Sequence, residues 1–228
     1  KLSEMFKNSI LSFIICICVM ASYNAQLSNS NLPIIIVTTD DEIPDEPKIN
    51  GTISIKYDTV GGVNSINDPL NYHSSYLGIE TRGNSTQGFD KKTYSIELRT
   101  AANEDTSVNL FGMGGEEDWI LHAMVIDKSQ VRIPMSFYLA QRMGQYASEF
   151  KYVELVLNGD YRGTYILVEK IKRDDDRVSI AKLDEDDLSG DSLTGGYILR
   201  MDWLDNPQGF ESDYNSQGGN PMFYQWYY

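Results

Sequence analysis

The stretch TRGNSTQGFDKKTYSIEL, residues 81–98, is the part of the chain that most strongly indicates its fold. It begins with a polar turn that contains Gly83 and Gly88, and it passes through the adjacent Lys91 and Lys92 into an alternating pattern. Glycine allows the backbone to approach a ligand closely, and backbone N–H groups beside cations form a cradle for phosphate. Adjacent lysines that open a strand point to opposite faces, so only one of them reaches a shared cleft. The alternative interpretation is an ordinary turn with solvated lysines at a sheet edge.

Alternating and apolar segments elsewhere predict further strands. Residues 76–80 and 93–99 flank the turn as an antiparallel pair, which places the lysines beside it. Residues 34–37 form an apolar run and residues 51–57 alternate, so both are expected to be strands. The strongest hairpin signal lies in residues 152–168, where Asn-Gly separates two apolar runs. Together these elements predict an antiparallel sheet.

One helix is expected at residues 130–143. Apolar residues recur there at helical spacing, Ser129 is a suitable N-cap, and Gly144 stands where a C′ glycine ends a helix. Pro134 fits a helix only within its first turn. The helix therefore begins later, near Ile133, or it has a kink at the proline.

Charge and composition limit the class of protein. The net charge of −14, from 33 acidic and 19 basic residues, argues against a nucleic-acid partner because the phosphates would be repelled. A phosphate site must then be a local basic patch. The hydrophobic fraction of 41% is ample for a packed core. His73 and His122 are too isolated for a zinc centre, and His122 is expected to be a hydrogen-bonded core residue.

Residues 1–25 have the pattern of a secretory signal peptide. Lysines flank an apolar stretch that is too short to span a bilayer, and small residues precede an expected cleavage after Ala25. Cys16 and Cys18 both lie in this segment, so the mature protein would have no cysteine nucleophile, cysteine metal ligand or disulfide. We therefore expect a secreted or cell-surface protein with no stable membrane span after cleavage. Residues 26–50 follow as a leader that contains the first strand.

A series of further segments follows the glycine turn in fixed order. They are NLFGM at 109–113, EDWILHA at 117–123, DKS at 127–129, YVELVLNGDYRG at 152–163, VEKI at 168–171 and TGGYIL at 194–199. Together they resemble the spore-coat protein H (CotH) kinase family, in the secreted form of Bacteroidetes-like bacteria. The resemblance extends from about residue 32 to the last residue, and the combination is more specific than any single motif.

The resemblance implies an α+β, atypical protein-kinase-like fold for residues 51–228. It implies an antiparallel-sheet N-terminal lobe, one main helix and an incomplete second lobe, with ATP and Mg²⁺ as cofactors. Arg82, Ser85 and Lys92 would contact phosphates, with Lys91 as the alternative lysine, and residues 169–171 would form the hinge that holds adenine. The expected cofactor-binding residues are Arg82, Gly83, Asn84, Ser85, Lys91, Lys92, Glu169 and Lys170.

The chain departs from the family pattern in two respects. Members of the family commonly have an acid where this chain has Tyr138. Either Glu97 or Glu169 is then the partner of the phosphate-contacting lysine, or this member of the family binds nucleotide weakly. The aspartates that the family is expected to use for catalysis and metal binding would lie beyond Tyr228, so we assign no catalytic residue and no metal site and expect a C-terminally truncated fragment. Asp202 is kept as a minor candidate for binding a cation.

The leading functional hypothesis is an exported kinase that transfers the γ-phosphoryl group of ATP to serine or threonine of surface or secreted proteins. This chain would carry mainly the nucleotide-binding part and would be inactive by itself. The alternative is a non-catalytic cell-surface binding or structural module for a protein or glycan partner, in which aromatic residues stack on sugars. Candidates for such stacking are Trp203, Phe210, Tyr214 and Trp226. A glycosidase gains little support, because no pair of acids stands out.

Overall fold

The computed structural model describes residues 26–69, 71–202 and 208–227. The expected signal peptide, its two cysteines and Trp203 lie outside the described residues. The strands are β1 (Asn29–Ser30), β2 (Ile34–Thr39), β3 (Ile49–Lys56), β4 (Asn64–Ser65), β5 (His73–Arg82), β6 (Thr93–Arg99), β7 (Val108–Asn109), β8 (Gly115–Glu116), β9 (Asp118–His122), β10 (Phe150–Leu157), β11 (Asp160–Glu169), β12 (Leu199–Arg200), β13 (Gly209–Asn215) and β14 (Pro221–Trp226). The helical elements are η1 (Ser85–Gly88, a 3₁₀ helix), α2 (Arg132–Arg142) and α3 (Gly190–Thr194).

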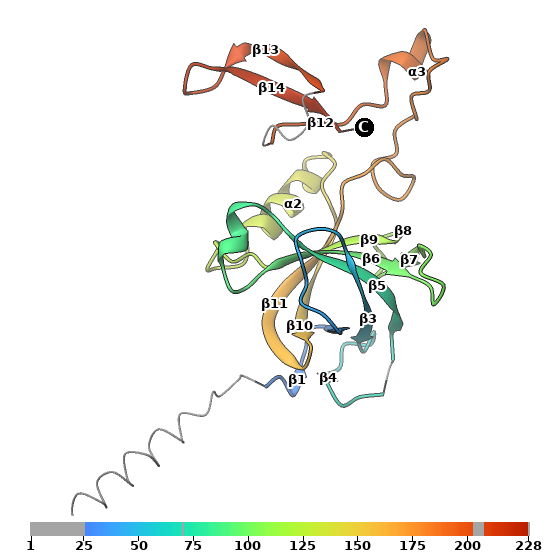
Figure 1. The fold of residues 1–228 in the computed structure, drawn as a ribbon, viewed down its shortest axis with the longest axis vertical. Coiled ribbons are helices and arrows are strands. Elements are labelled where there is room, and N and C mark those ends of the chain that lie inside the picture. Colours follow the sequence, from blue (N-terminus) through green and yellow to red (C-terminus); the bar gives the residue numbers. More distant parts are fainter. Residues whose placement is uncertain (1–25, 70, 203–207, 228) are drawn as a thin grey trace, which may run out of the picture.

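Seven strands close into a barrel in the order β10-β11-β9-β6-β5-β3-β2 (Figure 1). Neighbouring strands are antiparallel except at the closure, where β2 pairs with β10 in parallel and Ile34 to Val37 lie opposite Glu154 to Leu157. The prediction of an antiparallel sheet is therefore wrong in one respect, because the sheet closes on itself through a parallel pair of strands. Closure removes the free edges that an open sheet would expose.

Buried apolar side chains from every strand of the barrel fill its interior. One fully buried residue from each strand illustrates this packing: Ile35, Ile55, Leu77, Ile96, Trp119, Leu155 and Tyr165. Full burial of one aliphatic side chain contributes roughly 1.5–3 kcal/mol. The barrel is thus a packed core, and ligands must bind outside it or at its ends.

The expected hairpin is confirmed as β10 and β11. Its two-residue turn has positive φ at Asn158 (52°) and Gly159 (84°), as the tight hairpin turn between twisted strands requires. The Asn158 side chain also accepts a hydrogen bond from the Thr39 N–H at 2.8 Å, which ties the turn to the end of β2.

Helix α2 packs on the outside of the barrel, over β9, β10 and β11. Ile133 and Phe137 contact a small apolar cluster that includes Ile166 and Val168. Pro134 lies in the first turn of the helix and needs no kink, and Gly144 at φ 75° follows the last turn as expected.

The prediction that Ser129 is the N-cap of α2 is wrong. The helix begins at Arg132, and the Asp127 carboxylate accepts the Arg132 N–H at 2.8 Å while it also binds the Ser129 hydroxyl. The hydrogen bond from Ser129 and that from the Arg132 N–H lower the pKa of Asp127 to about 2.

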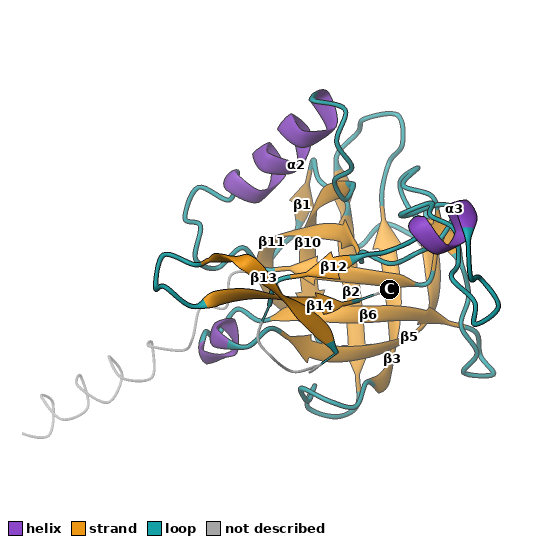
Figure 2. Cartoon of the chain, turned by 90° about the horizontal axis from the view of Figure 1, so that it is seen from above, coloured by secondary structure: helices purple, strands orange, loops and turns teal. Residues whose placement is uncertain are grey.

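The C-terminal part forms a separate three-stranded sheet in the order β12-β14-β13. Figure 1 shows this sheet above the upper end of the barrel. Figure 2 shows it from above, where it lies over the barrel and α2 lies to one side. The architecture is therefore mixed α+β, as expected, and most of its regular elements are strands. Within the described residues no helix is long and apolar enough to cross a membrane.

Candidate functional site

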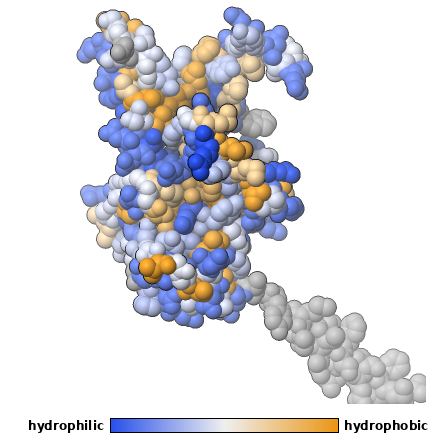
Figure 3. All heavy atoms as spheres, turned by 180° about the vertical axis from the view of Figure 1, so that it is seen from behind, coloured by the Kyte–Doolittle hydropathy of each residue, from blue (hydrophilic) through white to orange (hydrophobic). Residues whose placement is uncertain are grey.

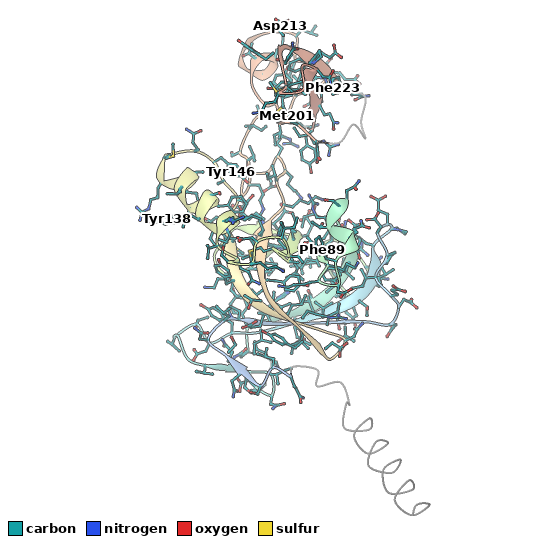
Figure 4. All side chains as sticks on the ribbon, turned by 90° about the vertical axis from the view of Figure 1, so that its left-hand side faces the viewer. Phe89, Tyr138, Tyr146, Met201, Asp213 and Phe223 are labelled. Atoms are coloured by element: carbon teal, nitrogen blue, oxygen red, sulfur yellow. The ribbon has the colours of Figure 1, made fainter. Side chains whose placement is uncertain are left out.

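A cavity of about 560 Å³ lies between the outer face of the barrel, α2 and strand β12. Figure 4 shows α2, marked by Tyr138, and the turn marked by Phe89 on opposite sides of the upper end of the barrel, with Met201 above both. The lining residues are Arg82, Ile120, His122, Ile133, Phe137, Ser148, Val168, Glu169, Lys170, Ile171, Ile198, Leu199, Arg200, Asp202 and Tyr227. We call this space the central cavity.

One wall of the central cavity is apolar. Along β9, Trp119 and Leu121 point into the barrel, so the alternate residue Ile120 points outward. Val168 lies on the same outer face because it pairs with Ile120 in the neighbouring strand. Phe137 of α2 completes this wall, which suits a flat apolar group.

Two cations of the expected site lie on the polar wall. Arg82 is exposed at the end of β5, and its Nη1 lies 3.4 Å from the Ser95 hydroxyl. Lys170 follows β11, and its Nζ lies 3.3 Å from an Asp118 carboxylate oxygen. The structure therefore brings the turn candidate Arg82 and the hinge candidate Lys170 to one cavity, from segments 88 positions apart.

His122 lines the central cavity and was not expected there. It is hydrogen-bonded, as predicted, because its Nδ1 accepts the Met124 N–H at 3.0 Å, but it faces outward from the barrel. Burial lowers the pKa of His122, and the positive charges of Arg82 and Lys91 lower it further. A neutral ring with Nδ1 as acceptor carries its proton on Nε2, which is then a donor.

Glu169 lines the cavity, but its carboxylate is engaged in the fold. Oε1 forms an ion pair with Arg177 Nη1 at 2.9 Å, and Oε2 accepts the Glu149 N–H at 2.8 Å. Burial raises the pKa of Glu169, while the Glu149 N–H and the Arg177 charge oppose that rise. The side chain of Arg177 is 0% exposed and lies 4.6 Å over the Trp119 ring.

The other residues of the glycine turn are not among those that line the cavity. The strand begins at Thr93, so Lys91 and Lys92 precede it rather than open it. Lys91 Nζ donates to the Thr164 carbonyl at 2.6 Å and lies 4.5 Å over the Tyr165 ring, whereas Lys92 Nζ donates to the Gln87 carbonyl. The predicted contacts of Gly83, Asn84, Ser85 and the two lysines with phosphate stay predictions.

The expected acidic partner of the phosphate-contacting lysine is not found in Glu97 or Glu169. Glu97 binds Lys48 at 3.0 Å and Arg99 at 2.7 Å, and Glu169 binds Arg177. Tyr138 is 51% exposed, and its hydroxyl accepts a hydrogen bond from Arg142. This part of the expectation is therefore wrong, because both acids neutralise other cations.

A group of three carboxylates with metal-like spacing lies beside the connection that leaves β11. Glu116, Glu117 and Asp118 bring carboxylate oxygens within 4.8 Å of one another. The Lys172 ammonium occupies their centre, at 2.7, 2.7 and 3.4 Å. Burial disfavours its charge, but the hydrogen bonds to Glu116 and Glu117 raise the pKa of Lys172 above its usual value. The cluster therefore anchors the connection to the barrel.

The fold and the central cavity define a class of protein: a barrel unit and a C-terminal sheet with a ligand-sized cavity between them that offers one apolar and one cationic wall. A family model described as CotH kinase protein matches residues 79–227, more than half of the chain. The chain belongs to the CotH kinase family. No curated protein shows a significant match to it.

Proposed function

We propose that the intact protein is an exported atypical protein kinase that transfers the γ-phosphoryl group of ATP to serine or threonine of surface or secreted proteins. One observation carries the proposal: the central cavity places an apolar wall and the cations Arg82 and Lys170 around one ligand-sized space. Membership of the CotH kinase family supports it. In this proposal the barrel with α2 corresponds to the N-terminal lobe, and residues 169–171 correspond to the hinge.

The two walls suit the two ends of a nucleotide. Adenine would pack against Ile120, Val168 and Phe137, where a flat apolar group is excluded from water. The triphosphate would be held by Arg82, whose planar guanidinium matches phosphate oxygens, and by Lys170. The Nε2 proton of His122 adds a neutral donor to the same cavity. A volume of about 560 Å³ lies within the ordinary range for small-molecule sites.

Mg²⁺ is implied by the family, and the residues present offer a partial fit. Mg²⁺ is usually bound by one or two carboxylates together with phosphate oxygens. Two carboxylates, Glu169 and Asp202, lie on the cavity wall. Glu169 is held by Arg177, so Asp202 would serve by exchanging its present interaction for the ion. When bound, the ion would neutralise charge on the transferring phosphoryl group.

The transfer itself exchanges one bond for another. The acceptor oxygen forms a bond to the γ-phosphorus as the bond to the β,γ-bridging oxygen breaks, ADP leaves, and the hydroxyl proton is released. We assign no residue of this chain to the removal of that proton. The chain contributes binding and electrostatic stabilisation, which supply most of the catalysis in phosphoryl transfer.

Nucleotide binding tests the proposal directly. We would titrate the protein with a fluorescent ATP analogue, with and without Mg²⁺, and compare Arg82→Ala and Lys170→Ala with the control Arg162→Ala. Arg162 lies on β11, 3.8 Å from Asp160 and outside the cavity. Loss of a charged hydrogen bond costs about 1.5–3 kcal/mol, which weakens binding by roughly 10- to 150-fold.

The result that sinks the proposal is an absence of binding, or binding that both cavity variants leave unchanged. In that case the rival function, a non-catalytic module for a protein or glycan, becomes the better interpretation. Export is tested separately: the protein recovered outside the source cell should begin at Gln26, as mass spectrometry of its N-terminus would show.

A further inference from the structure

A second cavity, of about 810 Å³, lies on the C-terminal sheet and is largely apolar. Its walls include Leu183, Tyr197, Leu199, Phe210 and Trp226, with Arg173 and Lys182 as its charged residues. We call it the aromatic groove. Figure 3 shows apolar atoms gathered in the hollow between the two projections at the top of the molecule.

The apolar side chains of the aromatic groove are unusually exposed. Phe210 is 42% exposed, and Tyr197, Leu199 and Trp226 are each 41% exposed. Their rings form a connected group, since the Trp226 centroid lies 5.8 Å from that of Tyr197 and 5.4 Å from that of Phe210. A contiguous exposed apolar patch of this kind marks a binding surface more often than a solvated one.

The charged residues favour an acidic partner. Lys182 is paired with Asp184 at 2.5 Å, and both side chains are exposed. Arg173 forms no ion pair with any residue that the structure describes, in a chain whose net charge is −14. A guanidinium beside an apolar surface is well suited to a carboxylate.

The lining also distinguishes a peptide from a sugar. Sugars present hydroxyl groups on every side, and each needs a hydrogen-bond partner once it leaves water. Among the described lining residues only Tyr197 and Trp226 are neutral side chains with a polar group, and the Tyr197 hydroxyl already donates to the Leu193 carbonyl at 2.6 Å. The indole N–H of Trp226 is thus a single neutral donor, and it accepts no hydrogen bond. An apolar side chain needs no such partners, so the groove favours a peptide.

The aromatic groove adjoins the central cavity. Leu199 of β12 lines both spaces, so they meet at this strand. In the described sheet β12 pairs with β14, whose other neighbour is β13. A peptide held in the groove would therefore lie next to the cavity in which we place the nucleotide.

We propose that the aromatic groove binds an extended segment of the acceptor protein. A large apolar side chain of that segment packs among Tyr197, Phe210 and Trp226, and an adjacent acidic side chain binds Arg173. The identity of the peptide as a phosphoryl acceptor rests on the proposed function, whereas the binding of a peptide in the groove does not depend on it.

Three labelled peptides test the groove by fluorescence anisotropy: Gly-Asp-Phe-Ser-Gly, Gly-Lys-Phe-Ser-Gly and Gly-Asp-Ala-Ser-Gly. We expect the first to bind at least ten-fold more tightly than the other two. Trp226→Ala should weaken its binding at least ten-fold. The control Tyr214→Ala, at a residue of the same sheet that is 75% exposed and outside the groove, should not. Arg173→Glu should reverse the preference towards the lysine peptide, a gain that misfolding cannot produce.

Two results would overturn this inference. One is equal binding of the three peptides, or an unchanged preference in Arg173→Glu. The other is a protein dimer in sedimentation that Trp226→Ala dissociates, because the groove would then be covered by a second copy. Titration of the same samples with the ATP analogue distinguishes the two proposals. Peptide binding without nucleotide binding refutes the proposed kinase function alone. Nucleotide binding without peptide binding refutes the proposed peptide site alone.

Discussion

Replacement of Arg177 by methionine is the sharpest test of how the barrel is joined to the chain that follows it. Arg177 and Glu169 form an ion pair at 2.9 Å with side chains 0% and 5% exposed. Arg177 also donates to the Met113 carbonyl at 2.9 Å and covers Trp119. Arg177→Met keeps most of the packing but leaves the Glu169 carboxylate buried without its cation.

The expected loss is large because one partner of a buried pair is removed. Such a loss costs about 3–5 kcal/mol, roughly 6–20 °C in Tm for a domain of this size. The double variant Arg177→Met, Glu169→Gln removes both charges and should recover much of that loss. Urea denaturation at pH 7.5, followed by tryptophan fluorescence, measures both variants against the original chain.

The pH dependence supplies an independent check. Burial already raises the pKa of Glu169, and removal of the Arg177 charge should raise it further. A carboxyl whose pKa is higher in the folded state binds more protons there, so stability falls as pH rises from the ordinary value through the raised one. Arg177→Met should therefore be less destabilising at pH 5 than at pH 8. A loss below 1 kcal/mol that is the same at both pH values would refute this account.

Four further variants test other parts of the fold. Lys172→Met should destabilise the protein more at pH 8 than at pH 5 in urea melts, because burial raises the pKa of Glu116 and loss of the ammonium should raise it further; an equal effect at both pH values would contradict this. Burial opposes the charge of Glu97, yet its hydrogen bonds to a lysine and an arginine lower its pKa to about 2. Its stabilisation is thus present above pH 4.5 and lost towards pH 2, so Glu97→Gln should cost stability at pH 7 and little near pH 2 in thermal melts. Gly51→Ala would place a Cβ 2.6 Å from a carbonyl oxygen of β2 and should cost about 1–3 kcal/mol, whereas Gly88→Ala meets nothing within 4 Å and should be neutral by calorimetry.

Elements with a local signal were predictable from the sequence. The Asn158-Gly159 turn fixed the hairpin, because positive φ at two successive positions is tolerated by few other residue pairs. Gly144 marked the end of α2 for the same kind of reason. The start of α2 was less predictable, since Ser129 and Asp127 both suit a cap and only the contacts distinguish them.

Features that depend on distant segments were not predictable. No local pattern indicates that β2 pairs with β10 in parallel, because the partners are 120 positions apart. The same holds for Arg177, which a sequence shows only as one charge beside three aspartates. Of the predicted cofactor-binding residues, Arg82, Glu169 and Lys170 line the central cavity. His122 was missed because its apolar neighbours suggested the interior.

The parallel closure between β2 and β10 has a practical consequence for domain limits. The match to the family begins at residue 79, yet the ring of hydrogen bonds includes β2 and β3, which lie before it. A chain shortened to the matched region would lose β2, β3 and residues 73–78 of β5, and it would leave β10 and the remainder of β5 without these partners. Insolubility of such a chain would reflect a broken ring and would say nothing about the chemistry of the cavity. The smallest unit worth purifying therefore begins before Ile34.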